Sequence, residues 1–310
     1  MTETLRLTPA EILQHDIANE AAAALTPGVL KQGTAAPRQT AVAGLDGHLF
    51  VGLGTNNWEK QYAGRVNIDD AWFAAWAALL AKREAEAQRR GVTLCNLILP
   101  EKQVVMPEMR WRQPPSPDQR PLMQLLRRLP TGDSIYYAAD DLIAAKTAAP
   151  IWARRNSHWT ASGCLVTVGA LAARLGVGAD IETLRFACRR VRTTHDLPVH
   201  FFGDPPLVDA LELLANGPYV FEHHARQTTG RNTGSAYGIH NPDAPDQRRL
   251  VIFGDSFSYE FGLGAALSAL FAEVAFHWGK SIQWDRVEAL RADIVISEAA
   301  ERFLVTLPSA

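Results

Sequence analysis

Apolar runs alternate with helical periodicity along this chain. Continuous apolar segments bounded by turn residues occur at positions 92–99, 134–137, 250–253 and 292–298. Such runs are typical of strands buried on both faces, as in parallel sheets. Helical periodicity predicts helices at 9–24, 68–90, 120–129, 164–175 and 262–276, and a helix or turn at 140–149. This alternation predicts an α/β domain with a mainly parallel sheet.

The first forty residues differ from the rest. They contain the predicted helix at 9–24 and a link rich in Pro, Gly and Thr. The next segment, 43–52, has Asp46-Gly47 between two short apolar runs and predicts a hairpin. We therefore expect an N-terminal arm over residues 1–40, followed by one domain over 41–310.

Composition mainly excludes classes of function. Of 310 residues, 47% are hydrophobic and 21% charged, which is normal for a globular protein. The net charge of −2 gives no electrostatic basis for binding nucleic acid. No HExxH, GxGxxG or Walker pattern occurs, so we expect no metal and no cofactor. The three cysteines have no ligand spacing and are expected to be buried thiols, namely Cys95, Cys164 and Cys188.

The amino terminus gives an expectation about location. No basic segment precedes an apolar run there, and no stretch approaches ~18 apolar residues. As written, the sequence predicts a cytoplasmic protein. A periplasmic location is the alternative if a leader was removed.

The first candidate for chemistry is Ser256. It follows the predicted buried strand 250–253 and the turn Gly254-Asp255. A serine on a strand-to-helix elbow lies at the carboxyl end of a strand, where open α/β sheets bind ligands. The sequence therefore predicts a nucleophile at Ser256. The alternative is a serine that only caps the next helix.

The second candidate is His158, in the run Asn156-Ser157-His158-Trp159 before the predicted helix 164–175. Its polar neighbours and loop position favour a general base. A structural histidine is the alternative.

Together these segments resemble a known family, the SGNH-hydrolase-like proteins of the alginate O-acetyltransferase group (the AlgJ and AlgX type). The resemblance covers residues 44–304. It implies a three-layer α/β/α fold with circularly permuted catalytic blocks, in agreement with His158 preceding Ser256. The matching stretches are Gly44-Leu45-Asp46-Gly47-His48-Leu49-Phe50, Leu97-Ile98-Leu99-Pro100-Glu101-Lys102, Ser157-His158-Trp159, Gly254-Asp255-Ser256-Phe257, and Asp293-Ile294-Val295-Ile296 with Glu301-Arg302.

Carried over to this sequence, the resemblance implies that Ser256 is the nucleophile and His158 its general base. The backbone N–H of Ser256 would be one oxyanion donor. Ordinary SGNH enzymes add a glycine and an asparagine, but no matching asparagine is present here. The remaining candidates for oxyanion or substrate contacts are Gly279, Arg302, Trp159 and Tyr259. For any single tryptophan, the alternative to a role in substrate contact is a position in the hydrophobic core.

One position departs from the family pattern. The family has Asp-x-His-Trp, whereas this chain has Asn156 in place of the aspartate. An asparagine can orient an imidazole but cannot offset the charge of an imidazolium. Three alternatives follow: the enzyme is slow, another acid takes the place of the family aspartate, or the site has lost its catalytic function. Asp255 is expected to be structural. The acids that could substitute are Asp133, Asp140, Asp141 and Asp196.

The sequence thus predicts a carbohydrate O-acetyltransferase that works through an acetyl-serine intermediate. A carbohydrate acceptor and an acetyl donor are the expected partners. The resemblance also implies a membrane-bound acyltransferase as a candidate partner. The alternatives are a carbohydrate acetylesterase and a catalytically degenerate glycan-binding protein.

Overall fold

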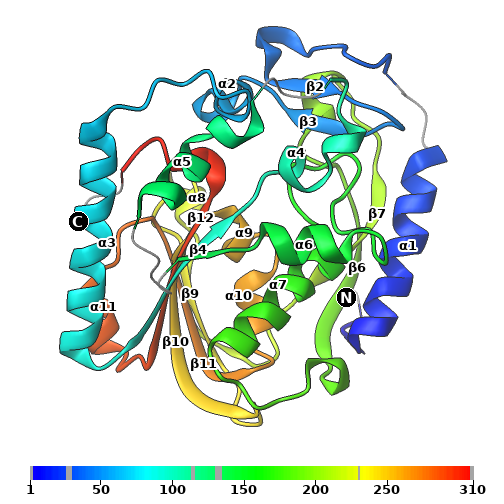
Figure 1. The fold of residues 1–310 in the computed structure, drawn as a ribbon. Coiled ribbons are helices and arrows are strands. Elements are labelled where there is room, and N and C mark those ends of the chain that lie inside the picture. The colour runs from blue at the N-terminus through cyan, green and yellow to red at the C-terminus, as the bar shows by residue number, and fades with distance from the viewer. Residues whose placement is uncertain (1–2, 26–29, 113–115, 130–134, 230, 308–310) are drawn as a thin grey trace.

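The computed structural model describes residues 3–25, 30–112, 116–129, 135–229 and 231–307. Within them the chain forms a seven-stranded sheet (Figure 1). The first five strands across it are parallel to one another. The sixth strand pairs antiparallel with the fifth, and the seventh pairs antiparallel with the sixth. In order across the sheet they are β5 (Ile135–Tyr137), β4 (Thr93–Leu99), β12 (Ile294–Ala300), β10 (Asp246–Gly254), β11 (Phe271–Trp278), β9 (Ala236–His240) and β8 (Tyr219–His223).

The parallel strands are apolar on both faces because helices cover both faces. Ile252 of β10 packs toward one helical layer, and its neighbour Val251 packs toward the other. One layer contains α6 (Ala139–Ala145), α7 (Ala161–Arg174) and α10 (Leu263–Leu267), and the other contains α3 (Asp70–Arg90), α5 (Pro121–Arg128) and α11 (Trp284–Ala289). The predicted three-layer α/β/α architecture is confirmed. Helix α3 ends at Gly91, as the sequence predicts.

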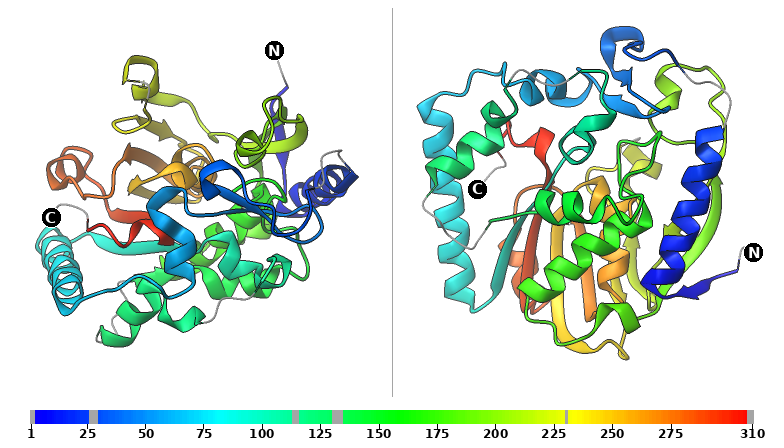
Figure 2. Two further views of the ribbon diagram at one scale, coloured as in Figure 1. Left: turned by 90° about the horizontal axis from the view of Figure 1, so that it is seen from above. Right: turned by 45° about the vertical axis from the view of Figure 1, so that its right-hand side comes forward.

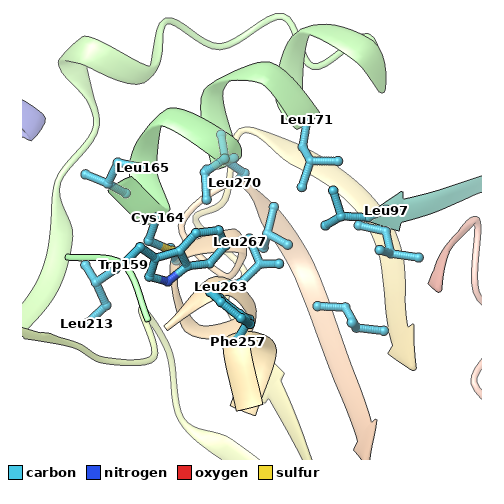
Figure 3. Close-up of a cluster of buried hydrophobic side chains, with 14 of the residues drawn as sticks. Leu97, Trp159, Cys164, Leu165, Leu171, Leu213, Phe257, Leu263, Leu267 and Leu270 are labelled. Atoms are coloured by element: carbon cyan, nitrogen blue, oxygen red, sulfur yellow. The ribbon is translucent and has the colours of Figure 1, made fainter. Parts of the chain in front are cut away.

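The largest apolar cluster lies between the sheet and α7 (Figure 3). Trp159, Cys164 and Leu165 reach it from α7 and the residues before it, and Phe257 and Leu263 reach it from the segment after β10. All three cysteines are buried and free. The same core therefore supports the segments that carry His158 and Ser256.

A second, smaller sheet lies beside this domain. It consists of β1 (Leu5–Leu7), β6 (Phe186–Thr193) and β7 (Val208–Leu213), all antiparallel. Helix α1 (Pro9–Leu25) packs on β7 and α7. Figures 1 and 2 place α1 and α3 at opposite sides of the molecule.

The shorter elements complete the fold. The hairpin predicted at 43–52 is present as β2 (Ala41–Ala43) and β3 (Leu49–Val51). Within the stretches that the structure describes, no helix is both long and apolar enough to cross a bilayer. The remaining short helices are α2 (Trp58–Tyr62), α4 (Lys102–Val105), α8 (Ala225–Thr229), α9 (Ser256–Tyr259) and the 3₁₀ turn η7 (Glu301–Phe303).

The predicted helix at 262–276 is wrong. Only the short α10 forms there, and β11 begins at Phe271. Phe276 pairs with Ile252 of β10 on one side and with Tyr237 of β9 on the other. A continuous apolar run is compatible with a buried strand as well as with a helix. Here the strand forms because its backbone can pair with β10 on one side and β9 on the other.

Candidate active site

The sharp elbow after β10 positions Ser256. Gly254 ends the strand, and a Cβ atom there would lie 2.4 Å from Glu298 Oε2, so a side chain would clash. The carboxylate of Asp255 accepts hydrogen bonds from Phe257 N (3.1 Å) and Ala300 N (3.0 Å). Asp255 thus ties the elbow to β12 and has the structural position expected for it.

Glu298 supports this elbow from within the sheet. Its Oε2 accepts hydrogen bonds from Asp255 N (2.9 Å) and from Ser258 Oγ (2.8 Å). Burial and the neighbouring charge of Asp255 raise the pKa of Glu298 well above its usual range. This environment favours the protonated carboxyl, and the side chain completes a buried network beneath Ser256.

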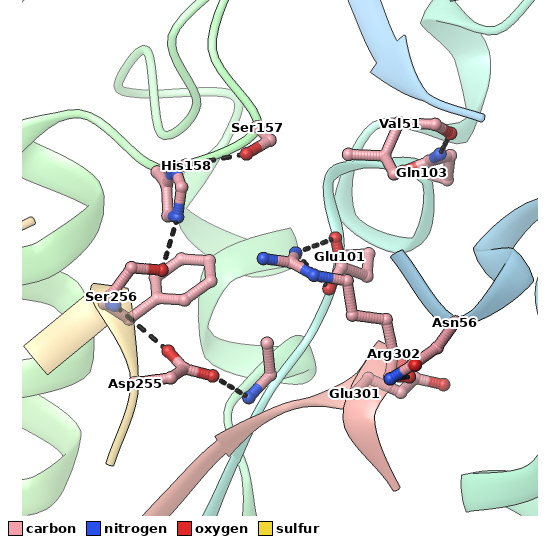
Figure 4. Close-up of polar contacts among 12 residues, drawn as sticks. Val51, Asn56, Glu101, Gln103, Ser157, His158, Asp255, Ser256, Glu301 and Arg302 are labelled. Atoms are coloured by element: carbon pink, nitrogen blue, oxygen red, sulfur yellow. Dashed lines mark hydrogen bonds and ion pairs between the residues drawn. The ribbon is translucent and has the colours of Figure 1, made fainter. Parts of the chain in front are cut away.

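His158 and Ser256 are brought together in space (Figure 4). His158 Nε2 lies 2.8 Å from Ser256 Oγ, although 98 positions separate the two residues. The imidazole stacks on Phe261, with ring centroids 3.5 Å apart, and Phe257 lies at a centroid distance of 4.7 Å. For Ser256 to donate to Nε2, the neutral ring must carry its proton on Nδ1.

Three acceptors surround His158 Nδ1. Asn156 Oδ1 lies 3.0 Å away, Ser157 Oγ 3.1 Å and Asp196 Oδ2 3.4 Å. Asn156 Oδ1 also accepts from His158 N (3.0 Å), which turns the amide oxygen toward the ring. The hydroxyl of Ser157 donates to Asp196 Oδ2, and its backbone N–H donates to Oδ1 at 2.8 Å. A chain of hydrogen bonds thus runs from Ser256 through His158 and Ser157 to a carboxylate.

Asp196 lies in the loop between β6 and β7, with 38% of its side chain exposed. Burial favours a higher pKa, but hydrogen bonds and charge from His158 and hydrogen bonds from Ser157 outweigh it. The net effect lowers the pKa of Asp196 to about 2. The carboxylate is therefore ionised at neutral pH.

Lys102 anchors the segment that carries the histidine. We call residues 153–160 the histidine loop. The buried Nζ donates to the carbonyl oxygens of Ala153 (2.7 Å) and Arg154 (2.8 Å) in this loop, and to that of Leu49 (3.0 Å). Burial lowers the pKa of Lys102 to about 7, against the opposing charges of Glu20 and Asp196.

The other predicted contacts have hydrogen-bond partners other than Ser256 in this structure. The Gly279 N–H donates to Gly254 O (2.9 Å), so its prediction as an oxyanion donor is wrong. The Arg302 guanidinium is bound to Glu101 at 2.7 and 2.8 Å, with both side chains buried. Tyr259 OH lies 2.7 Å from His224 Nδ1.

Trp159 has a packing position. It is buried, and its Nε1 donates to Phe261 O at 2.8 Å. This bond joins the histidine loop to the segment after Ser256 and fixes the backbone of Phe261, whose ring covers the imidazole.

Among the candidate substitute acids, Asp196 reaches the imidazole. Asp141 accepts instead from Tyr136 OH (2.7 Å), and Asp140 is exposed. Asp133 lies outside the described residues. Sequence reasoning could not rank these four acids, because the loop that carries Asp196 has no pattern of its own. It also missed four supporting residues, Ser157, Phe261, Lys102 and Glu298.

A cleft of ≈ 860 Å³ opens beside these groups. Ser256, His158 and Phe261 line one part of it, and residues of α1, β6 and β7 line the rest. Arg302 and Tyr259 are not among its lining residues. The hydroxyl of Ser256, the imidazole of His158 and the carboxylate of Asp196 are linked one after another in space and face a cleft. Such an arrangement can carry out acyl transfer.

Comparison with known protein families gives a match over most of the chain. The family model of the SGNH hydrolase-like domain of acetyltransferase AlgX matches residues 42–284. No curated protein matches the sequence.

Three solved structures resemble the fold. The O-acetyltransferase domain of Pseudomonas putida AlgJ is 16% identical, with a TM-score of 0.52 over 87% of this chain and 93% of that one. Bacillus cereus PatB1 is 11% identical, with a TM-score of 0.52 over 76% and 90%. A DHHW family protein from Eubacterium siraeum is 13% identical, with a TM-score of 0.55 over 91% and 95%. At such identities the likeness concerns the fold.

Proposed function

Because the chain belongs to the family of the SGNH hydrolase-like domain of acetyltransferase AlgX, we propose that it acetylates a carbohydrate hydroxyl through an acetyl-Ser256 intermediate. Membership of this family supports carbohydrate O-acetylation in general. The observation that carries the proposed intermediate is the 2.8 Å contact between His158 Nε2 and Ser256 Oγ, with Asp196 behind the ring.

In the first half of the reaction, Ser256 Oγ attacks the carbonyl carbon of an acetyl ester. His158 Nε2 takes the hydroxyl proton and returns it to the departing oxygen of the donor. The products are the free donor alcohol and acetyl-Ser256. In the second half, His158 takes the proton of a sugar hydroxyl as the sugar oxygen attacks the acetyl carbon. The bond from that carbon to Ser256 Oγ breaks, and His158 returns the proton to Oγ, which gives the acetylated sugar and the free serine.

The imidazolium that forms in each half needs a negative charge near Nδ1. Asn156 supplies only an oriented oxygen. Asp196 supplies the charge, directly at 3.4 Å and through the hydroxyl of Ser157. A carboxylate behind the ring favours the enzyme over a degenerate binding protein, because a binding site has no need of it.

The oxyanion of the tetrahedral intermediate needs donors as well. The Ser256 N–H at the start of α9 is the proposed first donor. Glu101 holds the guanidinium of Arg302, whose side chain extends toward Ser256 in Figure 4 and remains the proposed second donor.

The proposed partners follow from this chemistry. They are a sugar acceptor, an acetyl donor, and a membrane-bound acyltransferase that would supply the donor.

Incubation of the protein with p-nitrophenyl acetate tests the proposal. We expect release of p-nitrophenol above the buffer rate and one acetyl group on Ser256 by mass spectrometry of a quenched digest. Ser256→Ala and His158→Ala should lower the rate by on the order of 10⁴-fold or more. If the folded protein forms no adduct and releases no phenol above buffer, the proposed mechanism is wrong.

A further inference from the structure

The cleft extends from the nucleophile to the N-terminal helix. Besides Ser256 and His158, it is lined by Asp16, Asn19 and Glu20 of α1 and by residues 191–193 of β6 and 209–213 of β7. Its volume of ≈ 860 Å³ is near the upper end of small-molecule pockets, about 300–1,000 Å³. A segment of a glycan with more than one sugar can therefore lie along it.

Carboxylates outnumber cationic side chains among the described lining residues, and one of them, Glu212, is paired with Arg189 outside the lining at 2.5 Å. Its cationic side chains are Arg192 and Arg226, and no lysine lines it. Burial lowers the pKa of His195 to about 4, so this histidine adds no positive charge at neutral pH. Its carboxylates are Asp16, Glu20, Asp196, Asp209, Glu212 and Glu260.

Both arginines lie near carboxylates of the same cleft. Arg192 Nε lies 3.5 Å from Asp209 Oδ1, and Arg226 Nη1 lies 3.8 Å from Glu260 Oε1. Asp16 accepts from the backbone N–H of Ser162 at 2.7 Å. Burial raises the pKa of Asp16 to about 6, so at neutral pH it is mostly ionised.

We infer that this cleft binds the sugar acceptor and takes a glycan without anionic groups, whether uncharged or amine-bearing, while it excludes polyuronates. The inference rests on the proposed function. A polyuronate carries one carboxylate on every sugar and would meet carboxylates in excess along the lining. Like charges brought together at an interface disfavour binding and so select against the wrong partner.

The apolar part of the lining suits the same ligand. Leu211, Leu213 and Phe261 lie among the polar groups of the cleft. They offer contact to the C–H faces of sugar rings, which neutral and amine-bearing glycans share with uronates. Charge is therefore the feature that discriminates.

Three hexasaccharides of different charge test the inference. The full chain is incubated with p-nitrophenyl acetate and a cellulose, a glucosamine or a mannuronate hexamer, and acetylated sugar is measured by mass spectrometry. We expect the neutral and amine-bearing hexamers to be acetylated at least about 10-fold faster than the mannuronate hexamer at low salt. Added salt should narrow the gap, because it screens exposed charges.

A charge variant sharpens the test. Asp209→Asn with Glu212→Gln removes two negative charges and leaves Arg192 and Arg189 without their partners. Acetylation of the mannuronate hexamer, relative to that of the cellulose hexamer by the same variant, should rise about 10-fold.

The outcomes separate the two proposals. Absence of acetyl-Ser256 without any sugar present contradicts the proposed function. If the adduct forms but the mannuronate hexamer is acetylated as fast as the others, no hexamer is acetylated, or the charge variant changes nothing, the inference about the acceptor is overturned.

Discussion

Ser256 and His158 lie 2.8 Å apart, but two very different regions hold them there. The elbow, residues 254–258, follows a central strand and is bound to β12 through Asp255 and Glu298. The histidine loop, residues 153–160, belongs to no strand. Lys102 holds it from one side and Asp196 from another.

The difference concerns burial and charge. Glu298 and Ser258 are fully buried, and the elbow depends on hydrogen bonds within the core that the carboxyl groups of Glu298 and Asp255 accept. Asp196 is partly exposed and reaches the imidazole from a connection outside the large sheet. Changes in the elbow should therefore act on folding, and changes around the histidine loop should act on catalysis while the fold persists.

Among the residues that hold Ser256 and His158 in place, the largest effect is expected at Asp196. Asp196→Asn keeps the shape but removes the charge behind the imidazole, so kcat for p-nitrophenyl acetate should fall by about 10²–10⁴-fold, as in serine proteases that lose the triad carboxylate. Thermal unfolding should change little. Asp141→Asn, in which the altered acid lies away from the imidazole, is the matched control and should keep its activity.

Asn156 provides the rescue. Asn156→Asp places a carboxylate where the amide oxygen now lies, 3.0 Å from His158 Nδ1. In the Asp196→Asn background it should restore at least about 10-fold of the lost rate. If Asp196→Asn alone leaves kcat unchanged, the proposed role of the Asp196 charge behind the imidazole is contradicted.

Glu298 tests the elbow. Glu298→Ala leaves Asp255 N and Ser258 Oγ without their buried acceptor, so unfolding free energy should fall by about 2–4 kcal/mol. Glu298→Gln keeps an acceptor oxygen of the same shape, so it should lose less than half as much. Chemical denaturation measures both, and equal losses would contradict the role of Glu298 as a buried acceptor.

Lys102 tests the anchor of the histidine loop. Lys102→Met fills the space but donates nothing to the carbonyl oxygens of Ala153 and Arg154. We expect kcat to fall about 10-fold, because the imidazole is then held less tightly and near-attack geometry is sensitive to small displacements. Comparing kcat with the unfolding free energy decides the role; a large loss of stability with unchanged kcat would make Lys102 a folding residue.

The smallest effect is expected at Asp16, on the outer wall of the cleft. Its raised pKa of about 6 means that the folded state favours the protonated carboxyl. This contribution to stability is present below about pH 4 and is lost as the pH rises to 6. Asp16→Asn mimics the neutral form, so its stability advantage should be near zero at pH 4 and on the order of 1–2 kcal/mol at pH 7. An advantage independent of pH would contradict this account.

Much of the molecule could be predicted from local patterns. The buried runs of β4, β10 and β12, the end of α3 at Gly91, and the positions of Ser256 and His158 on a turn and a loop follow from residues close to one another in the chain. Such features depend on backbone preference and hydrophobic periodicity, which neighbouring residues determine.

Tertiary structure alone decided the rest. Phe271–Trp278 became a strand because β9 and β10 pair with it. Gly279 turned its N–H to Gly254, and Asp196 reached the histidine loop from a connection 39 positions beyond Ser157. None of these contacts has a local signature, because distances between side chains far apart in sequence depend on how the layers pack. The sequence by itself therefore determined which residues are candidates for the chemistry, and packing determined which carboxylate lies behind the imidazole.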